Sequence, residues 1–320
     1  MAVHKIKFKR RTDNFNPVKE RLFHKCSGII VKVLLYVLLF DLVYTFLYPF
    51  LYMLVTSIKS PEDILDVTVN WIPNTVYFKN YKLSYEILDY PLRFFNTFIV
   101  TALATLGHVF SCAYVGYGFA RYKFAGKRFA FILLLLSIIV PVQTIIIPRY
   151  LLFGALGLST TSVPLWLPTL FGYGLQGGLF IFIFRQFFLS LPRSLEEAAS
   201  IDGCGPLGTF FKIALPSSRS SIMVVLVLSI VWHWNDYYEP SIYITTQDKY
   251  LLPMMLPELY NLMNGATATA GEAATEISNV FTEGVAMAAT ALTVLPIFVI
   301  YMFLQKKFVQ GIEKSGITGE

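Results

Sequence analysis

Four neighbouring side chains in one apolar stretch of the sequence have the chemistry to hold a polyhydroxylated ligand. Aromatic rings offer flat apolar faces, and an amide or a carboxylate beside them can hydrogen-bond to hydroxyl groups. Polar side chains inside long apolar segments usually face a cavity or the interior of a helix bundle. We predict a substrate pathway at these residues, with hydrogen bonding between neighbouring helices as the alternative role. The set is Trp232, Trp234, Asn235 and Asp236.

Other polar residues stand singly in apolar stretches, and for each of them a ligand contact and an inter-helix hydrogen bond are both open. They are Asp41, His108 and Gln143. Proline and glycine recur nearby, where they can bend helices into gates or simply allow close packing. These residues are Pro141, Pro148, Pro164, Pro168, Pro296, Gly172, Gly174, Gly177 and Gly178.

No pattern in the sequence predicts catalysis, a bound cofactor or a metal centre. The phosphate-binding loop of ATPases, the HExxH pattern of zinc proteases and the GxSxG pattern of hydrolases are all absent from the sequence. The three cysteines, Cys26, Cys112 and Cys204, form no CxxC pair. We therefore expect that the chain is not an enzyme and does not itself hydrolyse ATP.

The elements that would position these residues are apolar helices, and a polar connector at 191–217 divides them. Ser194 followed by Glu197 predicts a capping box, and hence a short helix that starts at Leu195. Asp202 and Gly203 predict its end, because glycine readily takes the left-handed conformation that closes a helix.

A second short helix is predicted in the same connector. Pro206 suits a first helical turn, and Pro216 is expected to end the helix. Between them, Leu207, Phe210, Phe211 and Ala214 recur at the spacing of one apolar face. Such a face on a polar connector would stay exposed without a partner, so the pattern favours docking on another protein over a purely structural role.

The composition indicates a polytopic membrane protein. Of 320 residues, 55% are hydrophobic and 14% are charged, which is too apolar for an ordinary soluble domain. The net charge of +6 does not indicate nucleic-acid binding, because the cations flank apolar segments instead of clustering on one face. The predicted fold class is an all-α integral membrane protein with six transmembrane helices. We expect them near 29–55, 94–119, 129–147, 162–184, 221–244 and 285–304, each close to the roughly 20 residues that cross a bilayer.

Lysine and arginine predict the orientation of these helices. Of the 26 such residues, 19 lie in the N-terminal arm, at 121–128, at 185–219 or after Leu304. Positively charged loops stay on the cytoplasmic side, so both termini and the connector are expected inside the cell. The chain then divides into a basic arm over 1–28, a first transmembrane helix over 29–56, an extracytoplasmic connector over 57–92, a core over 93–305 and a cytoplasmic tail over 306–320.

The connector and several other motifs resemble a known family. Glu197-Ala198-Ala199, Gly203, Ile213 and Leu215-Pro216 look like the EAA loop of type-1 ABC importer permeases, in particular the smaller permease of maltose-type carbohydrate uptake systems. The resemblance extends over most of the chain from about Arg93 onward. Its other motifs are Phe94–Thr97, Tyr117–Arg121, Trp234–Asp236 and Gln305–Gly311.

The resemblance implies a permease that forms half of the translocation pathway for a sugar or oligosaccharide in a bacterial cytoplasmic membrane. The implied partners are a second, homologous permease, two cytoplasmic ATPase subunits that use the ATP, an external solute-binding protein and membrane lipid. The connector is then the coupling element that seats in an ATPase subunit. The residues implied in that coupling are Glu197, Ala198, Ala199, Asp202, Gly203, Phe210, Ile213, Leu215 and Pro216.

Two rival classes remain. A stand-alone secondary transporter needs ion-coupling carboxylates near the membrane midplane, for which Asp41 and Asp236 are the candidates. A non-transporting membrane scaffold has less reason to carry polar and helix-breaking residues inside its spans.

Overall fold

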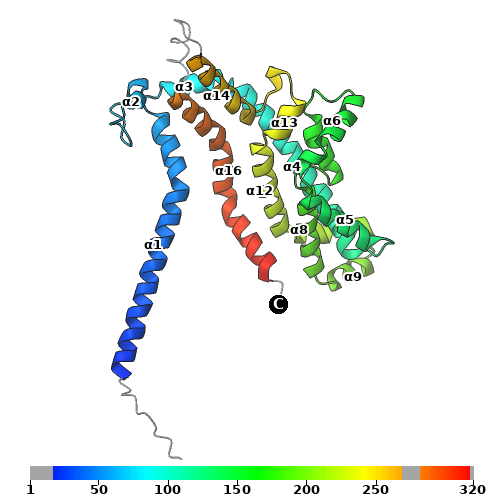
Figure 1. The fold of residues 1–320 in the computed structure, drawn as a ribbon. Helices are drawn as coiled ribbons and strands as arrows, with labels where there is room; N and C mark the ends of the chain where they lie inside the picture. Colours follow the sequence, from blue (N-terminus) through cyan, green and yellow to red (C-terminus); the bar gives the residue numbers. More distant parts are fainter. Residues whose placement is uncertain (1–16, 269–281, 318–320) are drawn as a thin grey trace, which may run out of the picture. The chain divides into compact units, whose positions relative to one another are not determined.

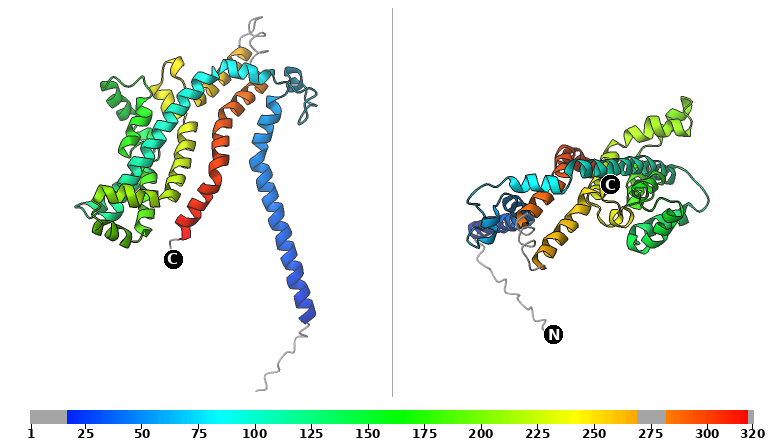
Figure 2. Two further views of the ribbon diagram at one scale, coloured as in Figure 1. Left: turned by 180° about the vertical axis from the view of Figure 1, so that it is seen from behind. Right: turned by 90° about the horizontal axis from the view of Figure 1, so that it is seen from above.

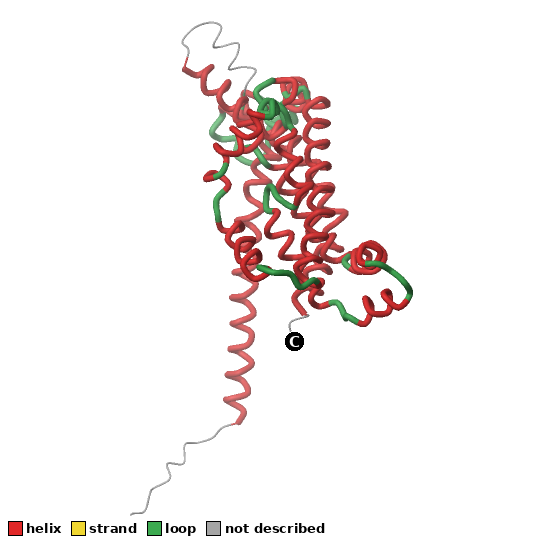
Figure 3. Tube along the Cα trace, turned by 90° about the vertical axis from the view of Figure 1, so that its right-hand side faces the viewer, coloured by secondary structure: helices red, strands yellow, loops and turns green. Residues whose placement is uncertain are grey.

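The computed structural model describes residues 17–268 and 282–317, and this part of the chain consists of helices and loops alone (Figure 3). The predicted all-α class is therefore confirmed. Contacts divide the chain into two compact units, residues 1–53 and 54–320.

Helix α1 (Pro17–Ser57) contains the first predicted transmembrane segment. Its residues 29–57 are long and apolar enough to cross a membrane. Side chains from Ile29 to Leu51 are exposed on every side of the helix, and Asp41 lies among them. A helix that is apolar all round suits a lipid environment better than the surface of a soluble domain.

Residues 57–93 fold into an ordered structure that contains α2 (Pro61–Leu65) and α3 (Lys79–Ile87). The carboxylate of Asp63 accepts hydrogen bonds from the backbone N–H and the side-chain amide of Asn74, at 3.0 and 2.8 Å. The Nζ of Lys59 donates to two backbone carbonyls of the same loop. Because the buried side chains of Lys59 and Asp63 are hydrogen-bonded within the segment, it has a defined shape of its own.

Four helices form the centre of the second unit: α4 (Tyr90–Arg121), α8 (Gly177–Ser190), α12 (Arg219–Asn235) and α16 (Glu283–Ile317). Helix α4 packs against α8 and α12, and α12 packs in turn against α16 (Figures 1 and 2). Helix α5 (Lys127–Ile139) lies beside α8. Buried aromatic side chains fill the contact around α4 and α8, among them Tyr117, Phe180, Phe184, Phe188 and Phe210.

Two glycines let α4 approach its neighbours closely. A Cβ at Gly107 would lie 2.2 Å from Oγ1 of Thr169, and a Cβ at Gly116 would lie 2.8 Å from Cβ of Phe184. Neither position has room for a side chain. Small residues at such contacts are a usual means of tight helix packing in membrane proteins.

The prediction of six spans is only partly met. Among the described residues, three helices are long and apolar enough to cross a membrane, at 29–57, 90–121 and 283–310, and the number rises to five if each of two bent helix pairs is one span. The predicted span at 129–147 stops as a helix at Ile139 and continues as η1 (Val142–Thr144) and α6 (Ile146–Ala155). Pro141 explains the interruption, because it has no N–H and disfavours a helical conformation at the residue before it.

The span predicted at 162–184 is interrupted as well. It comprises α7 (Val163–Trp166), η2 (Leu167–Phe171), a non-helical turn and the start of α8. In this turn Gly172, Gly174 and Gln176 have φ values of +72°, +129° and +64°. Of the two roles open for the prolines and glycines, bending is thus seen in this span, whereas Pro296 lies inside α16 without ending it.

The span predicted at 221–244 is helical only to Asn235, and the chain resumes in α13 (Tyr238–Tyr243). After the short turn η4 (Gln247–Lys249) comes α14 (Leu252–Ala268). Residues 269–281, positions 1–16 of the arm and positions 318–320 of the tail lie outside the described residues.

Candidate functional site

The predicted connector is a folded element at one end of the bundle, between α8 and α12 (Figure 1). Helix α9 (Ser194–Ile201) follows α8 after a bend of 78°. A second helical stretch contains α10 (Pro206–Thr209), the π-helical turn η3 (Phe210–Ala214) and α11 (Leu215–Ser217), and a bend of 76° leads into α12. We call residues 191–217 the connector element. Its two short helices occur where the sequence predicts them.

The predicted capping box is wrong. Arg193, not Ser194, occupies the N-cap position of α9, and no side chain makes a capping hydrogen bond there. The N–H of Glu197 donates to the carbonyl of Arg193 at 3.0 Å, so Ser194 already lies inside the first turn. Glu196 and Glu197 still suit this end, because carboxylates near a helix N-terminus interact favourably with the helix dipole.

The end of α9 agrees with the prediction. Gly203 has a φ of +80°, and its N–H donates to the carbonyl of Ser200 at 3.1 Å. The N–H of Cys204 reaches back to the carbonyl of Ala199 at 2.9 Å. This pair of bonds is a Schellman motif, in which a left-handed residue satisfies the last carbonyls of a helix.

The predicted end of the second helix at Pro216 is slightly early. Helical turns continue to Ser217, and the bend follows at Ser218. The hydroxyls of Ser217 and Ser218 donate to the carbonyls of Ile213 and Leu215, both at 2.7 Å. The two hydroxyls thus add side-chain bonds to carbonyls in the last turn of the interrupted helix, and the carbonyl of Leu215 also accepts from the N–H of Ser218 at 3.1 Å.

Glu196 anchors the connector element, a role that the sequence does not reveal. Its carboxylate pairs with Nε of Arg121 at 2.8 Å, and Arg121 also donates to the carbonyl of Leu191. The last residue of α4 is thus tied to both ends of the turn between α8 and α9. Glu197 is exposed and forms no ion pair with a described residue. Arg121, at the end of a long apolar helix, is the one feature of this region that could have suggested an acidic partner nearby.

Phe210 is a second anchor. It is 2% exposed, and its ring lies 5.3 Å from that of Tyr117, between centroids. The predicted single apolar face is therefore split, because Phe210 and Ala214 are buried while Leu207 and Phe211 remain more than half exposed. The sequence pattern overestimated the apolar surface left for a partner, since part of it packs on the chain's own α4 and α8.

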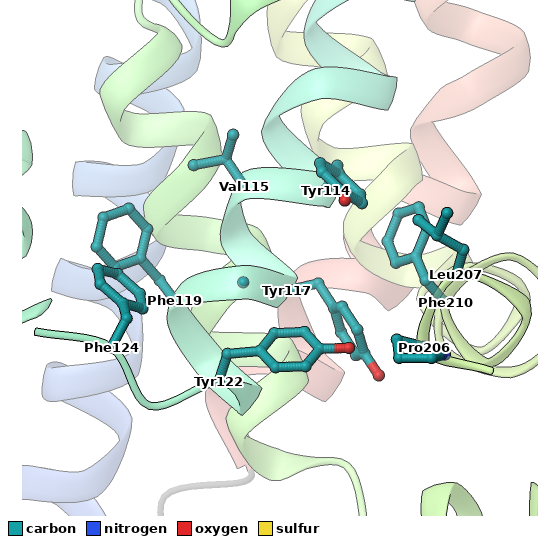
Figure 4. A pocket seen from close by; sticks show the side chains of 10 residues that line it. Tyr114, Val115, Tyr117, Phe119, Tyr122, Phe124, Pro206, Leu207 and Phe210 are labelled. Atoms are coloured by element: carbon teal, nitrogen blue, oxygen red, sulfur yellow. The ribbon is translucent and has the colours of Figure 1, made fainter. Parts of the chain in front are cut away.

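A groove of about 370 Å³ separates the end of α4 from the start of α10 (Figure 4). Tyr117 and Tyr122 point toward Pro206, while Phe119 and Phe124 lie on the opposite side of α4 (Figure 4). The groove is mainly aromatic. It therefore offers packing contacts and few hydrogen bonds.

The outer face of the connector element is apolar with charged residues beside it. Leu195, Ile201, Leu207 and Phe211 are 44%, 86%, 58% and 54% exposed. Of the predicted coupling residues, Glu197, Ala198, Asp202, Gly203 and Pro216 are exposed, Ile213 and Leu215 are half-buried, and Ala199 and Phe210 are buried. An exposed group of large apolar side chains marks a protein interaction surface.

The four predicted pathway residues each make a contact within the chain. Trp234 is 1% exposed, and its Nε1 donates to the carbonyl of Thr293 at 3.0 Å. Trp232 packs on Phe180. Asn235 donates to a carbonyl of its own helix, and Asp236 accepts from the N–H of Glu239 at the start of α13. These contacts support the structural alternative for Trp234 and Asp236.

A buried polar chain joins α4 to α12. Nδ1 of His108 lies 3.3 Å from Nε2 of His233 and also 3.3 Å from the hydroxyl of Ser229. Ser229 then donates to Thr105 at 3.2 Å. His108 is a predicted candidate, whereas His233 was missed, although it follows Ser229 by one helical turn. No group of three or more metal-binding side chains is found within residues 17–268 and 282–317.

Comparisons with known proteins agree on one kind of protein. Residues 113–314 match the family described as binding-protein-dependent transport system inner membrane component. The chain is 26% identical to the arabinooligosaccharides transport system permease protein AraQ of Bacillus subtilis over 83% of this chain and 89% of that protein. It is 30% identical to the protein of the same name from Halalkalibacterium halodurans over 70% and 72% of the two chains.

The fold is also similar to a solved structure. A chain from the crystal structure of a bacterial ABC transporter involved in the import of the acidic polysaccharide alginate matches with a TM-score of 0.73 at 22% identity. The match covers 88% of this chain and 98% of that chain. It shows that the two chains share a fold.

Proposed function

The chain belongs to the binding-protein-dependent transport system inner membrane components and is a permease of the ATP-binding-cassette importer class, and we propose that the solute it carries is a sugar or oligosaccharide. The relatives at 26% and 30% identity are permeases for arabinooligosaccharides, which supports a carbohydrate substrate. Such a permease forms one half of the translocation pathway, beside a second homologous permease.

The connector element is the surface through which this permease couples to ATP hydrolysis. The main support for this proposal is that one face of the element packs on the rest of the chain while the other face is exposed. Its inner face is fixed to α4 by Glu196 and Phe210, while Ile201, Leu207 and Glu197 face outward. A partner that seats on the outer face can therefore move α4 through the inner one.

The remaining partners follow from the importer class. They are two cytoplasmic ATPase subunits, which bind the ATP, and an external solute-binding protein; the permease chain itself holds no cofactor. The distribution of lysine and arginine supports insertion in a bacterial cytoplasmic membrane with both termini inside. Accessibility of Lys212→Cys to an impermeant thiol reagent tests that orientation, in a chain whose own cysteines are replaced by serine.

Reconstitution tests the function itself. The permease is co-expressed with the products of neighbouring genes, purified through a tag on this chain and placed in vesicles with ATP inside or outside. We expect the ATPase subunits to co-purify and labelled sugar uptake to require ATP on the connector side. Uptake that follows an ion gradient without ATP would contradict the proposal and favour the secondary transporter.

A further inference from the structure

A cavity of about 290 Å³ lies where two predicted spans are interrupted side by side. One wall is the break between α5 and α6, and the other is the non-helical turn before α8; Figure 1 labels the three helices. Its polar lining comes from Gln143, Arg149, Tyr173 and Gln176. The groove beside the connector element has instead a mainly aromatic and aliphatic lining.

The two glutamine side chains in this cavity are exposed and form no hydrogen bond with the described residues. Gln143 and Gln176 belong to the spans predicted at 129–147 and 162–184. An unpaired amide inside a membrane span is costly, and irregular backbone at that depth is tolerated where it is buried in protein or lines water. The two glutamines therefore indicate a water-filled cavity in which their amide groups can hydrogen-bond to a ligand.

The backbone at Gln176 supports the same reading. Its φ of +64° is a conformation that residues other than glycine adopt uncommonly. Such conformations persist where the surrounding structure holds them, and they are frequent at ligand sites. Here the turn places Gln176 in the lining of the cavity. A glycine at this position would relieve the backbone strain.

The charge of the cavity is balanced. Arg149 is the charged residue of the lining, and its Nη1 donates to Oε1 of Glu239 at 3.0 Å while Nη2 donates to Oε2. Nη2 also donates to the carbonyl of Pro164 at 3.0 Å. The guanidinium is thus neutralised by a bidentate pair, and a carboxylate of a ligand would find no free cation.

From this arrangement we propose that the cavity binds an uncharged sugar residue of the transported solute, with Gln143 and Gln176 as its hydrogen-bonding residues. Glutamine amides both donate to and accept from hydroxyl groups, as neutral sugars require. The volume of about 290 Å³ is just below the roughly 300–1,000 Å³ typical of ligand pockets, so one ring of an oligosaccharide fits at a time. The inference rests on the proposed sugar transport and narrows it to neutral over acidic sugars.

The test uses the whole reconstituted importer. Neutral probes are radiolabelled arabinotriose, lactose and maltotriose, and acidic probes are digalacturonate and an alginate trisaccharide. The variants are Gln143→Ala, Gln176→Gly and both together; glycine at 176 removes the amide and tolerates the positive φ. Gln186→Ala is the matched control, because Gln186 is an exposed glutamine on α8 that does not line the cavity.

We expect the wild-type importer to carry a neutral probe in preference to both acidic ones. Each single variant should lower affinity for that probe by about 2- to 10-fold, as loss of a neutral hydrogen bond does, and the double variant by more. Assembly and ATPase activity should stay near wild type, as should uptake by Gln186→Ala.

Two results would overturn the inference while sugar transport stands. One is ATP-driven uptake of acidic probes in preference to neutral ones, and the other is unchanged neutral-sugar affinity in the double variant. Failure of the wild-type importer to carry any of the five probes would overturn the proposed function and this inference with it.

Discussion

Two ion pairs hold the two ends of the bundle, and they differ in how completely they are buried. At the α13 end, Arg149 and Glu239 are 8% and 5% exposed and share two hydrogen bonds. At the α9 end, Arg121 meets Glu196 through Nε, and Glu196 is 19% exposed. A fully buried pair cannot separate without leaving a charge in a medium of low dielectric constant, whereas a partly exposed carboxylate can exchange its partner for water. The α13 end is therefore a fixed clamp, and the α9 end can adjust.

The largest effect should follow from breaking the fixed clamp. Glu239→Ala leaves Arg149 buried and unpaired, which should lower the free energy of unfolding by about 3–5 kcal/mol. Thermal unfolding of the detergent-solubilised permease measures the change. Arg149→Met combined with Glu239→Leu is the control, because it removes both charges and should recover most of the loss. If Glu239→Ala is as stable as the wild type, the α13 end is not a fixed clamp and the two ends do not differ as described.

Breaking the adjustable pair should cost less. Glu196→Ala removes the ion-pair partner of Arg121, whose side chain is 7% exposed, and we expect a loss of about 1–3 kcal/mol in the same unfolding measurement. Glu197→Ala, one residue on, is the matched control: it should leave stability unchanged but lower ATP-driven uptake. If the two variants behave alike, the inward and outward faces of α9 do not have separate roles.

Two glycines of the connector element, Gly203 and Gly205, differ in backbone conformation, and replacing each of them isolates the effect of backbone strain. Gly203→Val places a β-branched residue at a φ of +80°, which should cost roughly 1–2 kcal/mol and tilt the second short helix. A Cβ at Gly203 meets nothing within 4 Å, so the cost comes from the backbone alone. Gly205→Val is the control, because Gly205 has a φ of −68° and equally open space. We expect uptake to fall in the first variant and to persist in the second; equal uptake in both would remove the role of the turn.

The smallest effect is expected at the position of the rejected capping box. Ser194→Ala should change stability by less than about 0.5 kcal/mol, because its hydroxyl makes no capping bond in the structure. Chemical unfolding of the purified permease is sufficient to measure this. A loss of about 1 kcal/mol would mean that Ser194 caps α9 after all.

The sequence predicts the features that depend on neighbours along the chain. The turn at Gly203, the two short helices and the interruptions near Pro141 and Gly172 follow from local backbone chemistry. The capping box failed by one residue because Pro192 and Arg193 begin the turn earlier than the hydroxyl of Ser194 suggests.

Features that depend on contacts between distant segments were missed. Which of two adjacent glutamates faces inward depends on where Arg121 lies, and helical periodicity alone does not supply that. The same holds for His233, for Glu239 and for the side of the helix on which Trp234 lies. Gln143 and Gln176 lie at two separate helix breaks. The sequence does not show that these breaks lie side by side, so it does not predict that the two side chains line one cavity.

The glycine contacts of α4 have a consequence for the transport cycle. Because Gly107 touches Thr169 and Gly116 touches Phe184, sliding of α4 along either neighbour by part of a helical turn would bring a side chain into a space that admits only hydrogen. We therefore expect helix α4, the η2 turn and helix α8 to move together as one rigid block. We expect any alternation between inward and outward access to take place at the other boundaries of that block, where α4 meets α12 and where α8 meets α5.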